Sequence, residues 1–399
     1  MTVQTKQSGR DDCPSGGHRL IYFSSVPYAS YAQRPHFLVA AALADGFDSV
    51  LWIDPYPTRF PTPGDFVRLA RRTEEANSTM PHPRIHVVRP SAIPIEPLPM
   101  SACLNHLIAW RSVRARLFDY AHDTRHCVLA VGRPSKLAEW ALKHVPHHRS
   151  FVDILDNFPA FYRGMSRVSM KARLRAICEQ VTDVYCSSSQ IATDVSAIRS
   201  DALVVLNAYS TNSLPEPSST DRRTCIGYVG SIAEWFDWPL VCALASALPD
   251  VTVRLIGPEF VSRPANVPAN IDFMGERPQA EIAGLVQEFA VGLIPFRIND
   301  LTSGVDPIKF YEYRSMGVPV WSTTFGEMTQ RGEADGVTHV TLRTDWRRLW
   351  QELRAAAVPG FDEVARFRSA VSWERRFEPI LSRSRPEARV GGGAAEPFS

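Results

Sequence analysis

Short apolar runs alternate with helical patterns along most of the chain. In the first half the apolar runs are LIYF (20–23), VLWID (50–54), CVLAVG (127–132), FVDILD (151–156), VYCSS (184–188) and VVLN (204–207). The helical patterns between them end at Gly46, begin near Ser135, and cover SSQIATDVSAIR (188–199), where a serine suits the cap. Runs this short are typical of buried strands.

The same alternation restarts in the second half. Its strand candidates are CIGYVGS (225–231), VTVRLIG (251–257), IDFMG (271–275), VGLIPF (291–296) and VPVWST (318–323), and its helix candidates are 239–248, 279–288 and 307–316. Strands that alternate with helices predict parallel sheets in doubly wound α/β domains. Two such sets predict two Rossmann-like domains that face each other across a cleft, with ligands at the carboxyl ends of the strands.

The polar stretch SLPEPSSTDRRT separates the two sets and is the linker candidate. A chain of 399 residues is also too long for one ordinary core. The predicted organisation is a disordered N-terminus (1–17), a first α/β domain (18–212), the linker (213–224), a second α/β domain (225–371), a terminal helix packed back on the first domain (372–381) and a disordered tail (382–399).

Composition narrows the class of protein. With 45% hydrophobic and 22% charged residues the chain reads as soluble and globular, and a net charge of +2 gives no reason to expect nucleic acid. The seven cysteines show no CxxC spacing, which favours reduced thiols in the cytoplasm over disulfides or zinc. No apolar run reaches the length of a membrane span, and residues 1–17 lack the apolar core of a signal peptide.

The segment DPIKFYEYRSMGVPV (306–320) predicts a short helix between a loop and a strand. Asp306 suits the N-cap, Pro307 the first turn, and Gly317 the left-handed residue after the helix. A helix start gathers free N–H groups and the positive end of the dipole, which together bind anions.

Two charged residues of this segment have two interpretations. Lys309 adds charge at the helix start and Glu312, one turn later, can accept hydrogen bonds from vicinal hydroxyls, so a diphosphate with an attached ribose fits both. The alternative is an exposed i, i+3 ion pair worth a few tenths of a kcal/mol. The residues alone leave these alternatives open.

Two further strand ends carry donor-side candidates. Gly230, Ser231 and Ile232 follow the first strand of the second domain, where a glycine lets backbone approach a phosphate or sugar. The run GYVGS is not GxGxxG, so a dinucleotide cofactor has little support. Phe296 ends VGLIPF, where it packs against a base or belongs to the core.

The strand FVDILD carries two carboxylates at its end. A carboxylate at the carboxyl edge of a parallel sheet points into the cleft, and Asp156 there suits the role of a general base that takes a proton from a hydroxyl. The alternative is that Asp156 or Asn157 caps a helix that begins at Phe158. Asp153 lies deeper on the same face and reads as structural.

The order of these motifs resembles the bacterial GT-B glycosyltransferases of group 1 that assemble polysaccharides. The likeness rests on DPIKFYEYRSMGVPVWST, IGYVGSIAEWFDWPLV, LIGPE, FMGERPQAEI, VGLIPFR and FVDILDNFPAF, and spans most of residues 20–380. It implies that Lys309 binds donor phosphate, that Glu312 binds ribose, and that Pro307 and Ile308 line the donor site.

The resemblance also implies a nucleotide-sugar donor, UDP-linked by expectation, with no cofactor and no metal. The acceptor is then a saccharide or a lipid-linked saccharide of bacterial surface or exopolysaccharide synthesis. Retaining members often have an acidic residue where this chain has Gly304, which favours inversion, as does the place of Asp156, which matches the base of inverting relatives such as the glucuronosyltransferase of xanthan assembly. The alternatives are a nucleotide-sugar 2-epimerase of the same fold and an inactive nucleotide-sugar-binding protein.

Two segments of the first domain have weaker assignments. Tyr31, Arg34 and His36 lie in its first long loop, which faces the acceptor in this fold, although Arg34 equally suits a local salt bridge. The stretch AWRSVRARLF (109–118) predicts a basic amphipathic helix. It fits the anionic inner face of the cytoplasmic membrane, and it also fits an ordinary core helix with a solvated basic face.

Overall fold

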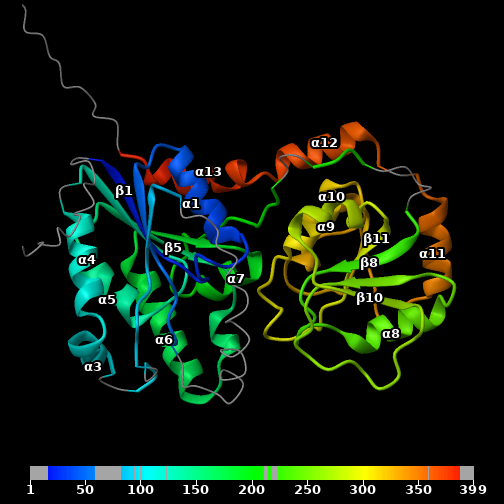
Figure 1. The fold of residues 1–399 in the computed structure, drawn as a ribbon, viewed down its shortest axis with the longest axis horizontal. Helices are drawn as coiled ribbons and strands as arrows, with labels where there is room; N and C mark the ends of the chain where they lie inside the picture. The colour runs from blue at the N-terminus through cyan, green and yellow to red at the C-terminus, as the bar shows by residue number, and fades with distance from the viewer. Residues whose placement is uncertain are drawn as a thin grey trace, which may run out of the picture.

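The computed structural model describes residues 17–58, 82–93, 96–98, 101–122, 124–210, 214–217, 223–357 and 359–386. They form two α/β domains that lie side by side (Figure 1). The predicted N-terminal disorder, except for residue 17, and half of the predicted linker lie outside these ranges. No helix in the described part of the chain is both long and apolar enough to cross a membrane.

The N-terminal domain is built on one parallel sheet in the order β3-β2-β1-β4-β5-β6-β7. Its strands are β1 (His18–Phe23), β2 (Ser49–Ile53), β3 (Ile85–Val88), β4 (His126–Val131), β5 (Arg149–Ile154), β6 (Asp183–Cys186) and β7 (Leu203–Val204). The chain reverses direction across the sheet between β1 and β4, which is where ligands bind in doubly wound sheets.

Helices cover both faces of this sheet. They are α1 (Arg34–Ala44), α3 (Ser101–Ile108), α4 (Arg111–Ala121), α5 (Lys136–His144), the 3-10 turn η1 (Phe158–Phe161), α6 (Gly164–Gln180) and α7 (Ser189–Val195). One core cluster joins the sheet to α4, α5, α6 and α7. The other joins it to α1 and to the last helix of the chain, α13 (Trp373–Ser384), where Phe37 stacks on Trp373.

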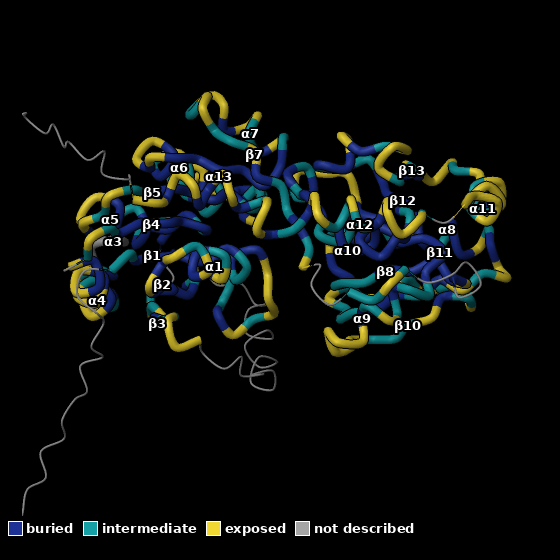
Figure 2. Tube along the Cα trace, turned by 90° about the horizontal axis from the view of Figure 1, so that it is seen from above, coloured by how far each residue is buried: buried dark blue, intermediate teal, exposed yellow. Residues whose placement is uncertain are grey.

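The C-terminal domain repeats the plan with a sheet in the order β10-β9-β8-β11-β12-β13. Its elements are β8 (Cys225–Val229), α8 (Trp238–Ala247), β9 (Val253–Ile256), β10 (Ile271–Gly275), α9 (Gln279–Val286), β11 (Phe289–Ile294), α10 (Ile308–Ser315), β12 (Val320–Ser322), η3 (Gly326–Gln330), η4 (Glu333–Asp335), β13 (Val337–His339), α11 (Trp346–Ala355) and α12 (Phe361–Ala370). The reversal falls between β8 and β11. Figure 2 shows the strands of both domains buried and the outer helices exposed on one side.

Some predicted boundaries need correction. The predicted start of the disordered tail, residue 382, is too early. Helix α13 continues to Ser384 and buries Leu381 and Ser384 against the first domain. Helix α7 ends at Val195, short of the predicted 199, and of VVLN (204–207) only Val204 lies in a strand, the two-residue β7 (Leu203–Val204). Strands β3 and β13 and the helices α3, α6, α11 and α12 have no counterpart in the predicted elements.

Candidate active site

Helix α10 carries both residues that the sequence predicts to bind a nucleotide-sugar. It follows the loop after β11, so its start lies at the carboxyl edge of the C-terminal sheet. Pro307 is the N-cap residue, and no side chain caps the helix. The first N–H groups of α10 therefore keep their capacity to bind an anion.

The predicted N-cap role of Asp306 is wrong, because its carboxylate has other partners. Oδ2 accepts hydrogen bonds from the Asn207 backbone N–H at 2.7 Å and from the Tyr311 hydroxyl at 2.8 Å. Oδ1 pairs with Arg331 at 2.6 Å. Asp306 is thus a buried anchor for the loop before α10.

Lys309 is a cation in an apolar setting. Its Nζ lies 5.4 Å from the ring centre of Tyr228 and 5.6 Å from that of Phe296. Burial lowers the pKa of its ammonium group. Within the described ranges no carboxylate comes within ion-pair distance of Nζ, so the charge is available to an anionic ligand.

Glu312 lies beside Lys309 and is only 7% exposed. One of its oxygens accepts a hydrogen bond of 3.0 Å from the hydroxyl of Tyr209, and burial raises the pKa of the carboxyl group. The interpretation of Lys309 and Glu312 as an exposed ion pair is therefore wrong. The phosphate and ribose roles stay predictions.

The other donor-side candidates gather around this start of α10. Gly230 has φ +136°, a conformation that favours glycine, and a Cβ there would lie 2.5 Å from Lys309 Nζ. The Ser231 carbonyl accepts a hydrogen bond from the Tyr228 hydroxyl at 2.7 Å. Phe296 and Ile232 are both buried in the core cluster, and Phe296 packs on Phe325.

Asp156 lies just beyond the end of β5, at the carboxyl edge of the N-terminal sheet. Burial raises the pKa of its carboxyl group to about 7. Asp156 is not the helix cap, because Asn157, the other candidate, occupies the N-cap position of η1, and no side chain bonds there. In the described part of the chain the Asp156 carboxylate has no ion-pair or hydrogen-bond partner.

Asp153 and Arg34 form a buried, two-pronged ion pair, with Arg34 Nη2 and Nε at 2.8 and 2.9 Å from the carboxylate oxygens. Arg34 is only 3% exposed, and its partner is 119 residues away, so its ion pair is a long-range contact and not the predicted local one. His36 bonds the Tyr28 carbonyl at 3.0 Å, and burial lowers the pKa of its ring. Tyr31 is 66% exposed and its hydroxyl reaches Glu276 of the other domain.

The two domains touch at the loop before α10. Asn157 donates a hydrogen bond of 3.4 Å to the Asp300 carbonyl, and the Ser188 hydroxyl donates one of 2.9 Å to the Gly304 carbonyl. A Cβ at Gly304 would lie 3.0 Å from Ile191. This contact accounts for a glycine here, because an acidic side chain would press against α7.

Both ends of α10 are tied to the chain that joins the domains. Before the helix, Asn207 holds Asp306 through its backbone N–H and its side-chain amide, each at 2.7 Å. After the helix, Arg223 donates to the carbonyls of Met316 and Gly317 at 3.1 and 2.6 Å. Arg223 thereby caps the C-terminal end, where cations stabilise a helix.

Sequence reasoning missed Tyr209, Asn207 and a pocket around Arg133 in the N-terminal domain. Each acts through a contact between distant parts of the chain, which no local pattern reveals. Within the described ranges no three His, Cys, Asp or Glu side chains gather in a way that suits a metal ion.

No family model matches the chain, and no curated protein matches its sequence. Solved structures do. The lipopolysaccharide outer core galactosyltransferase WaaB, in its apo form, is 11% identical over 92% of this chain and 99% of that one, with a TM-score of 0.57. A glycosyltransferase from Rickettsia africae is 11% identical over 92% and 98%, also with a TM-score of 0.57.

AviGT4, a glycosyltransferase involved in avilamycin A biosynthesis, is 12% identical over 92% of this chain and 97% of that one, with a TM-score of 0.50. Sequence identities this low are evidence for a shared fold and not for a shared activity. The two parallel sheets and the near-complete coverage of these structures agree with the predicted fold class. The chain has the GT-B fold, with two Rossmann-like domains.

Proposed function

We propose that this protein is a glycosyltransferase that moves a sugar from a nucleotide-sugar to a saccharide or lipid-linked saccharide. The observation that carries the proposal is Asp156, a carboxylate without a partner among the described residues and with a pKa raised to about 7. A base poised near neutral pH suits the removal of a hydroxyl proton. The likeness in fold to glycosyltransferases supports it.

The donor would bind at the start of α10. Its diphosphate would accept hydrogen bonds from the free N–H groups of the helix and pair with Lys309, and Gly230 leaves room for its approach. Glu312, oriented by Tyr209, would accept hydrogen bonds from the ribose hydroxyls. A UDP-sugar is the expected donor, and this arrangement needs no metal.

The proposed reaction is one displacement. The acceptor hydroxyl oxygen forms a bond to the anomeric carbon while its proton passes to Asp156. The bond from that carbon to the diphosphate oxygen breaks, and the nucleoside diphosphate keeps the electron pair, stabilised by Lys309 and the helix dipole. One displacement inverts the anomeric configuration, and Gly304 supplies no second acidic group.

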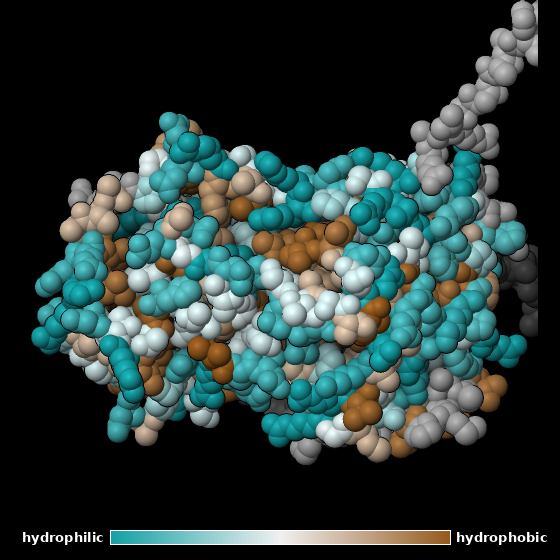
Figure 3. Space-filling model, turned by 180° about the vertical axis from the view of Figure 1, so that it is seen from behind, coloured by the Kyte–Doolittle hydropathy of each residue, from teal (hydrophilic) through white to brown (hydrophobic). Residues whose placement is uncertain are grey.

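We place the acceptor in bacterial surface or exopolysaccharide synthesis, at the inner face of the cytoplasmic membrane. Helix α4 buries Val113 and Leu117 in the core, so the apolar side of the predicted basic helix is not free for lipid. Helix α3 supports the membrane role instead, because Leu107 and Ile108 are 75% and 69% exposed. The surface seen in Figure 3 is otherwise largely hydrophilic, with scattered hydrophobic patches.

A titration and turnover screen with UDP-, GDP- and dTDP-sugars tests the proposal. A glycosyltransferase binds one class of nucleotide and slowly hydrolyses its sugar, and a suitable acceptor raises the turnover. An epimerase would release the 2-epimer of the sugar without any acceptor, which NMR detects. A binding protein would show affinity without turnover, and a protein that binds none of the panel contradicts the proposal.

A further inference from the structure

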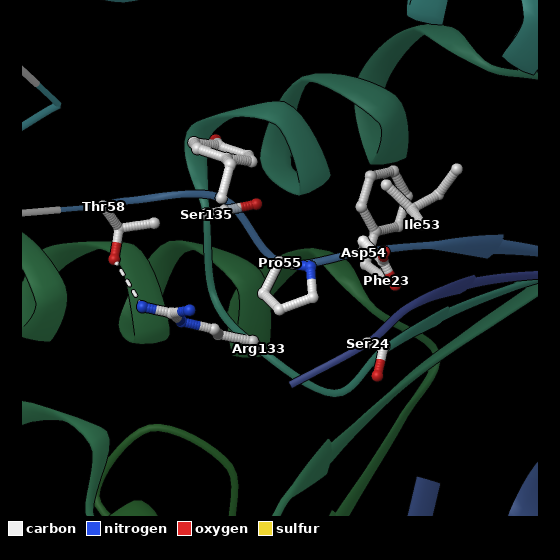
Figure 4. A pocket seen from close by; sticks show the side chains of 9 residues that line it. Phe23, Ser24, Ile53, Asp54, Pro55, Thr58, Arg133 and Ser135 are labelled. Atoms are coloured by element: carbon white, nitrogen blue, oxygen red, sulfur yellow. Dashed lines mark hydrogen bonds between the residues drawn. The ribbon is translucent and has the colours of Figure 1, made fainter. Parts of the chain in front are cut away.

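A small pocket lies at the carboxyl edge of the N-terminal sheet, where the chain reverses between β1 and β4. It is lined by residues that follow three strands, β1, β2 and β4: Ser24, Asp54, Pro55, Thr58, Arg133 and Ser135. Figure 4 shows Arg133 extending from the loop after β4 toward Thr58, with Pro55 beside it. None of the residues predicted for the acceptor lines this pocket.

The guanidinium of Arg133 is only partly engaged. Its Nη2 donates to the Thr58 hydroxyl at 3.1 Å and to the Tyr162 hydroxyl at 2.8 Å. Both partners are neutral, and within the described ranges no carboxylate pairs with Arg133. The Nε and Nη1 donors have no protein partner there, so the side chain is positioned by two hydroxyls and keeps a free donor edge.

The one acidic side chain of the pocket does not neutralise this charge. Asp54 Oδ1 accepts hydrogen bonds from the Tyr28 backbone N–H at 2.8 Å and from the Trp52 indole at 2.9 Å. Its Oδ2 lies 3.4 Å from Arg89 Nε. With Asp54 committed to these partners, the pocket keeps the positive charge of Arg133.

The size of the pocket limits what enters it. The space open to the centre of a water-sized group is only about 10 Å³, which admits one oxygen atom of a larger molecule and no sugar ring. A planar fork of donors fits carboxylate or phosphate oxygens better than any neutral group. The pocket therefore suits one oxygen of an anionic substituent on a larger molecule, with the rest of that molecule outside.

The pocket also lies close to the proposed base. Strand β4 pairs with β5, with Val131 opposite Val152, and Asp156 follows β5. Neighbouring strands lie about 5 Å apart, so the loops that carry Arg133 and Asp156 start from adjacent positions on the same edge of the sheet. Tyr162, which positions Arg133, follows the η1 turn that begins just after Asp156.

We infer that Arg133 binds an anionic substituent, a carboxylate or a phosphate, of the acceptor and so selects acidic or phosphate-linked saccharides. This inference rests on the proposed function, because it takes the N-terminal domain as the acceptor side. A carboxylate would come from a uronic acid, and a phosphate from a lipid phosphate or diphosphate carrier. Both groups present negatively charged oxygens that can accept hydrogen bonds from the guanidinium of Arg133.

The test is a set of calorimetric or NMR titrations with three probes: methyl β-glucuronide, methyl phosphate and neutral methyl β-glucoside. They are run on full-length protein that carries Lys309→Ala, so that the donor site does not contribute. Arg133→Gln is added to remove the charge, Arg133→Lys to keep charge without the fork, and Arg116→Gln as a control that removes an exposed arginine of the same domain. Circular dichroism checks that each variant is folded.

We expect Arg133→Gln to weaken binding of one anionic probe about tenfold or more, and Arg133→Lys to weaken it less. Arg116→Gln should change nothing, and none of the variants should change the response to methyl β-glucoside. Weakening with the glucuronide identifies a uronic acid, and weakening with methyl phosphate identifies a phosphate carrier. Equal affinities in Arg133→Gln and Arg116→Gln, for both anionic probes, overturn the inference.

A separate titration of wild-type protein with nucleotide-sugars distinguishes failure of this inference from failure of the proposed function. If nucleotide-sugars bind and the Arg133 variants behave like the control, the proposed function survives and this inference fails. If no nucleotide-sugar binds, the proposed function fails, and the assignment of the anion to an acceptor fails with it.

Discussion

Gly230 and Lys309 occupy adjoining space: a Cβ on Gly230 would lie 2.5 Å from the lysine Nζ. The contact joins the loop after β8 to the start of α10. A methyl group at position 230 would therefore displace the ammonium group of Lys309. That ammonium group is the positive charge that the first turn of α10 brings to the proposed phosphate site.

Gly230→Ala should therefore weaken nucleotide-sugar binding about tenfold, by moving Lys309 and by straining a residue at φ +136°. The measurement is a calorimetric titration with the donor found in the screen. Gly275→Ala is the matched control, because Gly275 also has a positive φ (+64°) but has nothing within 4 Å of its Cβ position. Equal losses in both variants would mean that strain, and not the lysine, accounts for the effect.

Lys309→Met should lower donor affinity by roughly 1.5–3 kcal/mol, the value of a charge-assisted hydrogen bond. The folded protein should be no less stable, because the variant removes a buried cation that has no counterion in the described ranges. Titration gives the first quantity and urea unfolding the second. Unchanged donor affinity would remove the phosphate role of Lys309.

Asp156→Asn should lower kcat by about 10²–10⁴ and leave donor affinity nearly intact, because the amide has the shape of the carboxylate but takes no proton. Asp153→Asn is the contrasting variant. It breaks a buried ion pair with Arg34 and should cost about 3–5 kcal/mol of unfolding free energy. The product of an α-linked donor should be β-linked by NMR, and normal turnover in Asp156→Asn or an α-linked product would contradict the base role.

The pH dependence has a definite sign. The pKa of Asp156 is about 7 in the folded protein against an ordinary value of 3.8, so the folded state binds the extra proton between these values. Stability from this group is full below about pH 4 and is lost as pH rises toward 7. Asp156→Asn should therefore be more stable than wild type at pH 8, by about 1–2 kcal/mol after allowance for partial exposure, and equal to it near pH 4.

Activity should move in the opposite direction. Because the ionised form of Asp156 accepts the proton, kcat should rise with pH through about 7. A pH–rate profile that is flat between 5.5 and 8.5 under saturating donor would speak against this role.

Binding to anionic vesicles should depend on α3 more than on α4. Replacing the exposed Leu107 and Ile108 by Gln should reduce sedimentation with phosphatidylglycerol vesicles several-fold, since it removes apolar surface that lipid would cover. Replacing Arg111 and Arg116 by Gln should reduce it only at low salt. If the wild-type protein stays in the supernatant and does not sediment with the vesicles at low salt, the proposed membrane binding is contradicted.

The strands and the α10 segment were open to prediction because their signals are local. Apolar runs such as FVDILD and CIGYVGS form buried strands, and Gly317, with φ +67°, ends α10 as its position indicates. Strand β3, with sequence IHVV, is only partly buried and four residues long, so its pattern is too short to stand out.

The rest of the site depends on contacts that no window of sequence contains. Tyr209 and Glu312 are 103 residues apart, and Arg34 and Asp153 are 119 apart. Arg34 looked like a loop residue free for an acceptor because its partner lies on β5, which only the folded sheet brings beside α1. Asp306 looked like a cap because Arg331 and Asn207, which take its carboxylate, lie elsewhere in the chain.

Hydrogen bonds from the chain that connects the domains hold α10 at both ends. Asn207 lies where the chain leaves the first sheet and bonds Asp306, just before the helix. Arg223 lies where the chain enters the second sheet and bonds the Gly317 carbonyl, just after the helix. Because Asn207 and Arg223 bond at opposite ends of α10, the course of the connecting chain and the placement of the helix that carries Lys309 depend on each other.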